Sequence, residues 1–422
     1  MPNLSQLLTS KSSAEYRRVF ELCRDISTEL DSVDGVYVVG GIVRDLILGR
    51  TPRDIDLSVV GDAKALSQKL AVRIGAGSPD ESQFLTFKID TCEIFSYVSS
   101  IDIVTARSET YSESAALPDV SVSSIDEDLI RRDFTVNAMA ISLTGTDWGT
   151  LVDPENGFGD VMRKRIKVLH DASFVDDPTR TFRAVRYAVR LGFTLDSRTN
   201  ELISKSLPSI DRLSGTRIRN EFDLILGEPK RVEMLKMAEE IGLLAAISPS
   251  LRVGTKSLQV LSEQSNSLSV ELADLLAITT FGLNEDEAKQ VVNRFDAPAA
   301  WGESIIGNAQ LAKHVAVLDQ PNLAPSDVSA ILRSIPLASI KTYILAGPPL
   351  PRRDRLVEYV EKIRFVKPEI TGDDLLDIGI AQGPIIGQLI DLVHEAKLDG
   401  KVRSKQEELD LAKSRLPDFL TK

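Results

Sequence analysis

The 422-residue chain is poor in several residue types, and each scarcity argues against particular kinds of site or protein. Aromatic residues make up only 5% of it, which argues against a surface on which many bases of single-stranded RNA stack. Two cysteines, Cys23 and Cys92, cannot build a disulfide framework or a thiolate zinc site on their own, which favours a reducing compartment. With only three histidines, a centre that needs four or more is excluded.

The chain also lacks the sequence features of membrane insertion and secretion. No apolar run approaches the ~18 residues of a membrane span. The N-terminus does not have the basic-then-apolar order of a signal peptide. Hydrophobic residues at 43% and charged residues at 27% are ordinary for globular proteins. We therefore expect a soluble, cytoplasmic protein of about three domains.

Charge is unevenly distributed along the chain. The net charge of −12 argues weakly against a polyanionic partner. Residues 163–190, however, carry eight basic and only three acidic side chains. Because the local field guides a ligand within a Debye length, this basic segment is compatible with binding phosphates.

Periodicity divides the chain into an α/β part and a helical part. The first ~145 residues alternate between strands and helices, and residues 110–124, which show no period, predict a mobile loop. A helix is expected from residue 125, and from about residue 174 the pattern is helical almost throughout. The fold class is therefore α+β, a mixed-sheet head followed by a long helical extension. Strands are expected over 36–39, 54–60, 84–87, 93–98 and 101–105, and helices over 42–48 and 63–74.

Asp54 and Asp56 lie two apart in a predicted strand, so they share one face while Ile55 and Leu57 face the core. Two carboxylates at this spacing can hold a pair of Mg²⁺ ions, which suits in-line attack on a phosphate. An isolated Asp-x-Asp is more often a solvated strand face. Asp102, on another predicted strand, is either a third carboxylate of the site or an ordinary polar residue.

Gly40 and Gly41 follow a strand and open a helix that contains Arg44. Backbone amides there can approach a triphosphate without a Cβ in the way, and a helix N-terminus favours negative charge. Gly-Gly alone is more often a tight turn. With Arg44 and the two aspartates one short helix later, the phosphate-binding interpretation is favoured.

The segment 131–140 places two arginines beside Asp133 and Asn137. Arginine can bind phosphate bidentately, and Asp and Asn can bond ribose hydroxyls. A capped helix start with surface arginines explains the segment equally well.

In the segment 176–190, Arg180, Arg183, Arg186 and Arg190 recur at helical spacing and line one face. Such a row repels itself unless anions lie beside it. Asp177 and Arg180, one turn apart, present an acceptor and a donor fork that can pair with the edge of a base. A solvated charged face is the alternative.

Taken together, four segments resemble the signatures of the class II tRNA nucleotidyltransferase and bacterial poly(A) polymerase family. They are Gly40 to Asp45 with Asp54-x-Asp56, Arg131 to Ala140, Asp176 to Arg180, and Ser214 to Glu221. The resemblance implies that Asp54 and Asp56 bind catalytic Mg²⁺ and that Gly41, Arg44 and Arg132 hold the triphosphate. It also implies that Asp133 and Asn137 contact the ribose and that Asp177 and Arg180 read the base of CTP or ATP. Arg183 and Arg186 would support the phosphates and the helix.

The same resemblance implies the domain order and the substrates. It implies a nucleotidyltransferase head over 1–146 and a neck for base recognition over 147–213. A helical body over 214–345 and a tail that binds tRNA over 346–422 follow. The sequence departs from the family at Asp176, where glutamate is usual. The basic residues Arg352, Arg353, Arg355, Lys362 and Arg364 are either tRNA-backbone contacts or an ordinary solvated helix.

Family members differ in product. The segment from Ile101 through Ala116, Leu117 and Pro118 resembles the full-length loop of CCA-adding enzymes, so CC-only addition is disfavoured. We expect Mg²⁺-dependent addition of CCA to the 3′ end of tRNA from CTP and ATP, with release of pyrophosphate. Addition of A alone, poly(A) synthesis and an inactive RNA-binding homologue remain alternatives.

Overall fold

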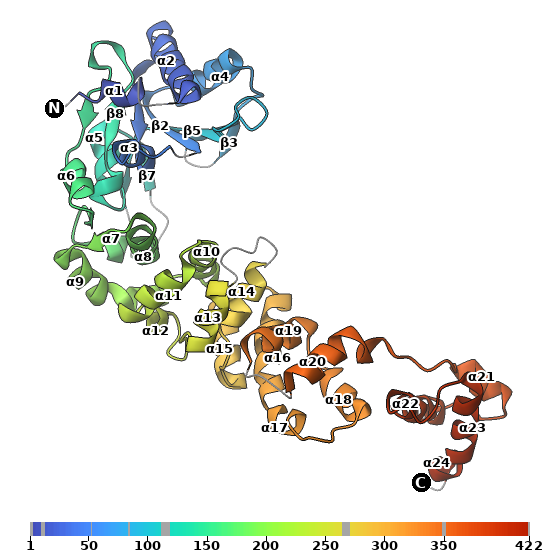
Figure 1. Ribbon diagram of the computed structural model, residues 1–422. Coiled ribbons are helices and arrows are strands. Elements are labelled where there is room, and N and C mark those ends of the chain that lie inside the picture. Colours follow the sequence, from blue (N-terminus) through green and yellow to red (C-terminus); the bar gives the residue numbers. More distant parts are fainter. Residues whose placement is uncertain are drawn as a thin grey trace. The chain divides into compact units, whose positions relative to one another are not determined.

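The computed structural model describes residues 3–9, 13–51, 53–82, 85–110, 119–263, 271–347 and 352–420. The chain forms two compact units (Figure 1). The first comprises Met1–Leu213 with Glu240–Ala246, and the second comprises Ser214–Glu239 with Ile247–Lys422. The domain boundaries expected at 146, 213 and 345 stay predictions.

The first unit is built on a seven-stranded sheet in the order β3-β4-β5-β2-β1-β8-β9. β2 and β5 run parallel, and the other neighbouring pairs run antiparallel. This mixed sheet confirms the predicted fold class. The strands are β1 Val33–Val39, β2 Asp54–Gly61, β3 Asp80–Ser82, β4 Thr86–Asp90, β5 Ser100–Thr105, β8 Ala140–Ser142 and β9 Leu151–Val152.

Helices α2 (Ala14–Glu29) and α4 (Ala63–Ile74) pack together, and each also contacts a strand of this sheet. Each begins at a side chain that satisfies an unpaired backbone N–H, Ser13 for α2 and Asp62 for α4. α4 ends at Gly75, whose φ of 84° is a left-handed conformation that glycine adopts at low cost. The bounds predicted for α4 are therefore confirmed at both ends.

The expected strand over 93–98 is wrong, because a side chain from another element takes its backbone N–H groups. The carboxylate of Glu15 on α2 accepts hydrogen bonds from the N–H groups of Ser96 (2.8 Å), Tyr97 (3.1 Å) and Val98 (2.9 Å). Donors used in this way cannot enter a strand ladder, so the segment forms turns.

The expected mobile loop over 110–124 is also wrong at its end. β7 (Asp119–Val122) pairs antiparallel with β6 (Arg107–Thr110) to form a separate hairpin. Residues 111–118 of the predicted loop lie outside the described residues, as does Phe84 at the start of a predicted strand. That strand is described from Thr86 onward, as β4.

The rest of the first unit is mainly helical, apart from a further short two-stranded sheet. β10 (Arg165–Ile166) and β11 (Thr194–Leu195) pair in parallel after Gly192 reverses the chain. The other elements are α1 Ser5–Leu8, α3 Gly41–Ile47, α5 Ile125–Ile130, η1 Thr135–Asn137, η2 Gly145–Asp147, α6 Gly157–Met162, α7 Ser173–Asp176, α8 Thr179–Leu191, α9 Ser197–Ser206 and η3 Leu207–Arg212.

From residue 214 the described chain is helical, as predicted, and two groups of buried apolar side chains form separate cores. One core includes Leu332 and Ile340, the other Leu389 and Val393. The helices are α10 Gly215–Leu226, α11 Arg231–Glu240, α12 Leu243–Ile247, α13 Thr255–Glu263, α14 Leu272–Thr279, α15 Glu285–Arg294, α16 Ala299–Ala312, α17 Val315–Leu318, α18 Pro325–Leu332, α19 Leu337–Ala346, α20 Arg352–Glu361, η5 Ile363–Phe365, α21 Gly372–Asp377, α22 Pro384–Leu398, α23 Lys405–Arg415 and α24 Pro417–Leu420.

Among the described helices, none is by itself long and apolar enough to cross a membrane. One pair, α18 and α19, reaches that length and composition only when the two are taken together across a bend of 112°.

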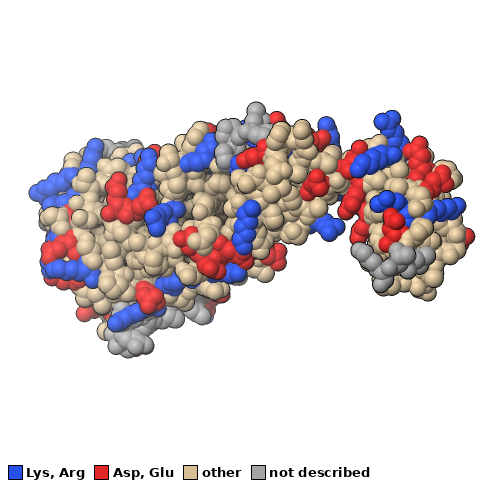
Figure 2. Space-filling model, turned by 90° about the horizontal axis from the view of Figure 1, so that it is seen from below, with Lys and Arg blue, Asp and Glu red and all other residues tan. Residues whose placement is uncertain are grey.

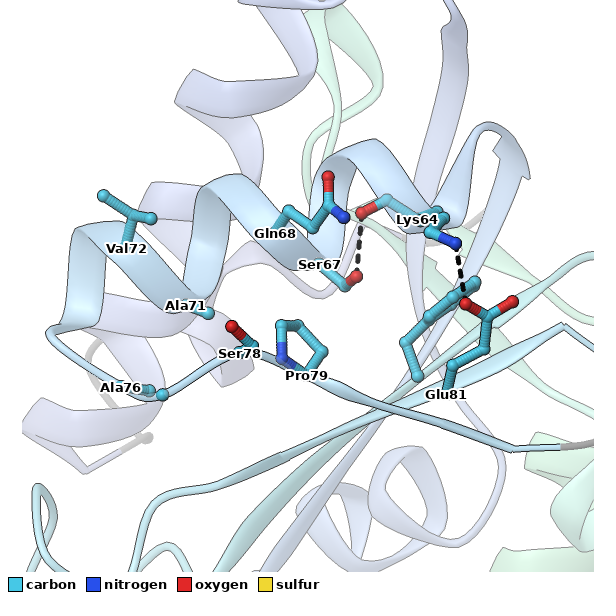
Figure 3. A pocket seen from close by; sticks show the side chains of 11 residues that line it. Lys64, Ser67, Gln68, Ala71, Val72, Ala76, Ser78, Pro79 and Glu81 are labelled. Atoms are coloured by element: carbon cyan, nitrogen blue, oxygen red, sulfur yellow. Dashed lines mark hydrogen bonds and ion pairs between the residues drawn. The ribbon is translucent and has the colours of Figure 1, made fainter.

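Surface charge is mixed. Figure 2 shows acidic and basic side chains interspersed on the face it displays. A pocket of about 260 Å³ lies beside α4 and the segment that leads into β3 (Figure 3). Lys64 and Glu81 form an ion pair of 2.7 Å beside it, and none of the candidate site residues lines it.

Candidate active site

The two aspartates of the predicted metal site lie on β2, and Asp102 lies on the parallel neighbour β5. Asp56 is directly opposite Asp102 in the strand register. Ile55 and Leu57 are fully buried, so the predicted alternation of core and open faces is confirmed. Asp54 is exposed and accepts a hydrogen bond of 3.0 Å from the Ser100 hydroxyl. The structure therefore places all three carboxylates along one pair of strands.

The neighbouring charges change the acidity of these groups. Burial raises the pKa of Asp56 to about 6, with the Arg132 guanidinium opposing the rise and Asp102 and Asp54 adding to it. Burial likewise raises the pKa of Asp102, against the influence of Lys88. Like charges that face one another in this way are relieved by a cation.

These carboxylates fit Mg²⁺ in one particular way. Within the described ranges, no three acidic, histidine or cysteine side chains group closely enough to hold a metal ion by themselves. Mg²⁺ is usually held by one or two carboxylates together with water and substrate phosphates. Asp54 and Asp56 thus suit an ion that binds with a phosphate substrate.

The glycine turn between β1 and α3 lets two arginines approach the backbone closely. Gly40 has a φ of 76°, and a Cβ added there would lie 2.8 Å from Nη1 of Arg132. A Cβ at Gly41 would meet Nη2 of Arg44 at 3.3 Å. These glycines therefore leave room for Arg132 and Arg44 at the turn itself, a use that the sequence did not indicate.

Four predicted nucleotide-binding residues form one chain of hydrogen bonds. Arg44 donates from Nη1 to Oδ1 of Asn137, and Asn137 donates from Nδ2 to Asp133 at 3.0 Å. Arg183 donates from Nε to the other Asp133 oxygen at 2.8 Å. Because Asp133 can only accept, the amide nitrogen of Asn137 must face it and the amide oxygen must face Arg44. This chain brings α3, η1 and α8 together.

Asp133 is the buried anion of that chain. Burial opposes its charge, but Arg183, Asn137 and Arg180 hold the pKa of Asp133 below its usual range. The row of arginines on α8 therefore does have an anion beside it, supplied by the protein.

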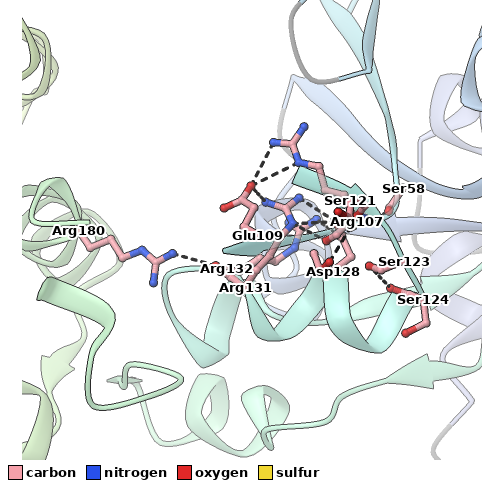
Figure 4. Close-up of polar contacts among 11 residues, drawn as sticks. Ser58, Arg107, Glu109, Ser121, Ser123, Ser124, Asp128, Arg131, Arg132 and Arg180 are labelled. Atoms are coloured by element: carbon pink, nitrogen blue, oxygen red, sulfur yellow. Dashed lines mark hydrogen bonds and ion pairs between the residues drawn. The ribbon is translucent and has the colours of Figure 1, made fainter. Parts of the chain in front are cut away.

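Asp128 holds a second group of arginines (Figure 4). Its side chain is fully buried. It accepts from Nη2 of Arg131 at 2.7 Å and from Nη2 of Arg132 at 2.9 Å. It also accepts from the Ser58 hydroxyl of β2 and from the backbone N–H of Arg107, which leads into β6. Burial opposes the charge, but Arg132 and Arg131 hold the pKa of Asp128 below its usual range.

Arg180 is buried, and its donors are bonded within the protein. Nη1 donates to the Ser173 hydroxyl at 2.7 Å and Nη2 donates to the backbone carbonyl of Arg131 at 2.8 Å. One oxygen of Asp177 accepts from the hydroxyl of Thr179 at 2.7 Å. The paired edge predicted from Asp177 and Arg180 is thus engaged with other groups in this structure. Arg180 and Asp176 also line a pocket of about 490 Å³ with Glu109, Arg131 and His170.

Three residues of the site were missed by sequence reasoning. Asp128, Glu109 and Tyr187 contact the arginines but stand outside the predicted roles. Asp128 precedes Arg131 and Arg132 by three and four residues, the spacing of helical ion pairs, and this signal could have identified it. Glu109 reaches Arg131 from the hairpin, which the local sequence does not indicate.

Two of the five basic residues that the sequence left open as tRNA contacts or as an ordinary solvated helix bond groups of the protein. Arg352 is 7% exposed and donates from Nε to Asp319 at 3.1 Å. Arg355 donates to the backbone carbonyls of Leu318 and Pro321. These bonds hold α20 against the end of α17, so both arginines are structural. The remaining three, Arg353, Lys362 and Arg364, are exposed.

Two family models match the chain. One, described as the poly A polymerase head domain, matches residues 36–167. The other, described as a probable RNA and SrmB-binding site of polymerase A, matches residues 192–253.

Curated relatives match nearly the whole chain. The A-adding tRNA nucleotidyltransferase of Geobacter sulfurreducens is 33% identical over 94% of this chain and 47% of the relative, so the chain spans about half of that protein. The A-adding enzyme of Halalkalibacterium halodurans is 29% identical over 97% of this chain and 95% of the relative. A CCA-adding enzyme of Lactobacillus delbrueckii subsp. bulgaricus is 30% identical over 88% and 91%.

Solved structures of CCA-adding enzymes are similar to this chain over nearly its whole length. CCA-adding enzymes complexed with CTP and with ATP both give a TM-score of 0.76, at 27% and 26% identity, over 98% of this chain and 99% of theirs. The Thermotoga maritima CCA-adding enzyme complexed with tRNA gives 0.70 at 27% identity over the same shares.

A mixed sheet with two aspartates on one strand, beside buried arginines, defines the head of a nucleotidyltransferase. The relatives then place the chain more closely: it belongs to the family of tRNA nucleotidyltransferases and bacterial poly(A) polymerases.

The raised pKa of Asp56 predicts a pH dependence of stability in EDTA. The folded carboxyl keeps its proton up to about pH 6, whereas the unfolded one loses it near pH 4, so this group lowers stability as pH rises between those values. Asp56→Asn should therefore stabilise the first unit at about pH 8 by roughly 1–3 kcal/mol, with the gain vanishing below about pH 4. Thermal unfolding at both pH values measures this. Asp34→Asn, at an exposed position on β1, is the control, and an equal gain from Asp56→Asn at both pH values would contradict the prediction.

The buried ion pairs of Asp128 predict a loss of stability in Asp128→Asn. Leaving two guanidinium groups without their shared anion should cost about 3 kcal/mol at neutral pH. The difference should begin to shrink below about pH 4, where the unfolded parent takes up this proton, and should vanish only at the lower pH at which the folded carboxylate is protonated as well. Asp126→Asn, exposed on the same helix, should unfold like the parent. A variant of Asp128 as stable as the parent at pH 7 would refute the anchoring role.

Proposed function

We propose that this chain transfers nucleoside monophosphates from ATP and CTP to the 3′ end of tRNA and releases pyrophosphate. The observation that carries the proposal is the position of Arg132, which acts electrostatically on Asp56 while its Nε is buried without a hydrogen-bond partner among the described residues. A buried donor of this kind suits an anionic ligand. A triphosphate would supply that anion beside the carboxylates.

Asp54 and Asp56 are the proposed ligands of Mg²⁺, and Asp102 on the neighbouring strand β5 is the third carboxylate of the site. When bound, Mg²⁺ lowers the pKa of the attacking 3′-hydroxyl and neutralises the leaving pyrophosphate. The two strands hold these carboxylates in a fixed register, which fixes where the α-phosphate must lie.

The arginines and the polar chain around them orient the nucleotide. Gly41, Arg44 and Arg132 are proposed to bind the triphosphate, with Arg183 and Arg186 behind it. Asp133 and Asn137 are proposed to bond the ribose hydroxyl. Their existing bonds to Arg183 and Arg44 support this role, because the same contacts that fix the arginines fix the ribose-binding atoms.

Asp177 and Arg180 are proposed to read the base. Both already bond protein groups, and these bonds set the present orientation of the Arg180 guanidinium and the Asp177 carboxylate. The helical second unit, with Arg353, Lys362 and Arg364 exposed on it, is proposed to bind tRNA.

Addition of A is common by name to the A-adding and the CCA-adding relatives, so transfer of AMP to a tRNA that ends in CC is the core of the proposal. Addition of the complete CCA is the specificity proposed from the sequence. Addition of A alone is the second candidate, and two relatives that match nearly the whole chain favour it by name.

Two tRNA substrates distinguish these specificities. Full-length protein incubated with ATP should extend a tRNA ending in CC by one A. With CTP and ATP together, a tRNA that lacks all three nucleotides should gain CCA if specificity is complete and remain unextended if it is A-only. Sequencing of the products identifies each case, and repeated A addition would indicate poly(A) synthesis.

Asp56→Ala should abolish incorporation but retain tRNA binding, and continued incorporation would refute the assigned role.

Arg180→Ala should reduce discrimination among nucleotides. Loss of a bidentate base contact removes about 10–100-fold of selectivity while some Mg²⁺-dependent transfer remains. Competition between ATP or CTP and the wrong nucleotides measures the change, with Arg198→Ala on α9 as an exposed arginine control. Faithful addition by the Arg180 variant would exclude the base-reading role.

A further inference from the structure

Tyr187 of α8 lies at the centre of the arginines. The guanidinium carbons of Arg183 and Arg44 lie 5.3 and 5.6 Å from its ring centroid. Those of Arg190 and Arg186 lie at 5.7 and 5.9 Å. Four cations from two helices thus surround one aromatic ring, all within the ~6 Å at which such contacts are attractive.

This arrangement addresses a specific electrostatic problem. Guanidinium groups gathered for a triphosphate repel one another whenever the nucleotide is absent. An aromatic face carries negative potential and attracts cations without adding a formal charge. A carboxylate in the same place would compete with the phosphates for the arginines, whereas a ring does not.

The ring is itself held in place. Phe134, from the segment next to Asp133, packs edge-on against it with centroids 6.0 Å apart and an angle of 84°. The Tyr187 hydroxyl accepts a hydrogen bond of 3.0 Å from Nη2 of Arg183. The hydroxyl thus serves one arginine, while the ring contacts all four.

We propose that the aromatic ring of Tyr187 is a positioning element that keeps Arg44, Arg183 and Arg186 aligned for the nucleotide. The inference rests on the proposed function, because it assumes that these arginines bind a nucleoside triphosphate. Tyr187 is a positioning residue, since it acts through the arginines.

Two substitutions separate the ring from the hydroxyl. Tyr187→Phe keeps the ring and should bind ATP and CTP within about threefold of the parent. Tyr187→Leu keeps an apolar side chain but loses the ring face, and should weaken nucleotide binding about tenfold. In steady state, the Leu variant should raise KM for the nucleotide while kcat and KM for tRNA change by less than about threefold.

A matched control removes another tyrosine ring. Tyr343 on α19 packs edge-on against Phe281 much as Tyr187 packs against Phe134. Tyr343→Leu should lower the thermal midpoint but leave ATP and CTP affinity unchanged.

A second measurement covers the case in which Tyr187→Leu does not fold. Phenylalanine, 4-fluorophenylalanine and 3,4,5-trifluorophenylalanine introduced at position 187 weaken the ring potential stepwise at nearly constant volume. The logarithm of Kd for ATP should rise with each step.

The outcomes are distinct. A constant Kd across the fluorinated series, or equal losses in the Phe and Leu variants, would overturn the role of the ring while the proposed function stands. If the parent chain bound ATP and CTP but did not extend tRNA, the proposed function would fail and the series would still decide the role of Tyr187. A parent that binds neither nucleotide would overturn both.

Discussion

The candidate site depends on holding several guanidinium groups together in a partly buried place before any substrate arrives. Two buried carboxylates supply negative charge and hydrogen-bond acceptors that hold these groups together. Asp133 anchors Arg183 and, through Asn137, Arg44, while Asp128 anchors Arg131 and Arg132. Since removal of one partner from a buried pair leaves the other charge uncompensated, these two aspartates also fix how α3, α5 and α8 lie around the sheet.

Arg132 links the carboxylates on β2 and β5 to the arginines of the site. Its guanidinium bonds Asp128 and also opposes the rise in the pKa of Asp56. The same guanidinium therefore acts to lower the pKa of both aspartates. Under the proposed function, a triphosphate bound to Arg132 would reduce the influence of this arginine on Asp56, and a divalent cation would then be needed to offset the negative charges of the carboxylates and phosphates. Metal and nucleotide are thus expected to bind cooperatively.

Local patterns were enough to predict much of the head. The alternation around Ile55 and Leu57 fixed which side of β2 carries the aspartates, and the caps of α4 fixed its ends. Failures came where a distant side chain took over local hydrogen bonds, as Glu15 does at 96–98. The contact between Arg44 and the ring of Tyr187 could not be predicted either, because it joins α3 to α8 only in the tertiary fold.

The surroundings of the proposed base-reading residue Arg180 could not be predicted from the sequence, and its hydrogen bonds explain why. Its two terminal nitrogens are bonded to Ser173 and to the carbonyl of Arg131, whose side chain is paired with Glu109 of the β6–β7 hairpin. A change in the aim of Arg180 must therefore break its bonds to the Ser173 hydroxyl and to the carbonyl of Arg131. Under the proposed base-reading role, the energy of re-aiming Arg180 would be set by these partners, so selectivity would depend on the groups around Arg180 as well as on Arg180 itself.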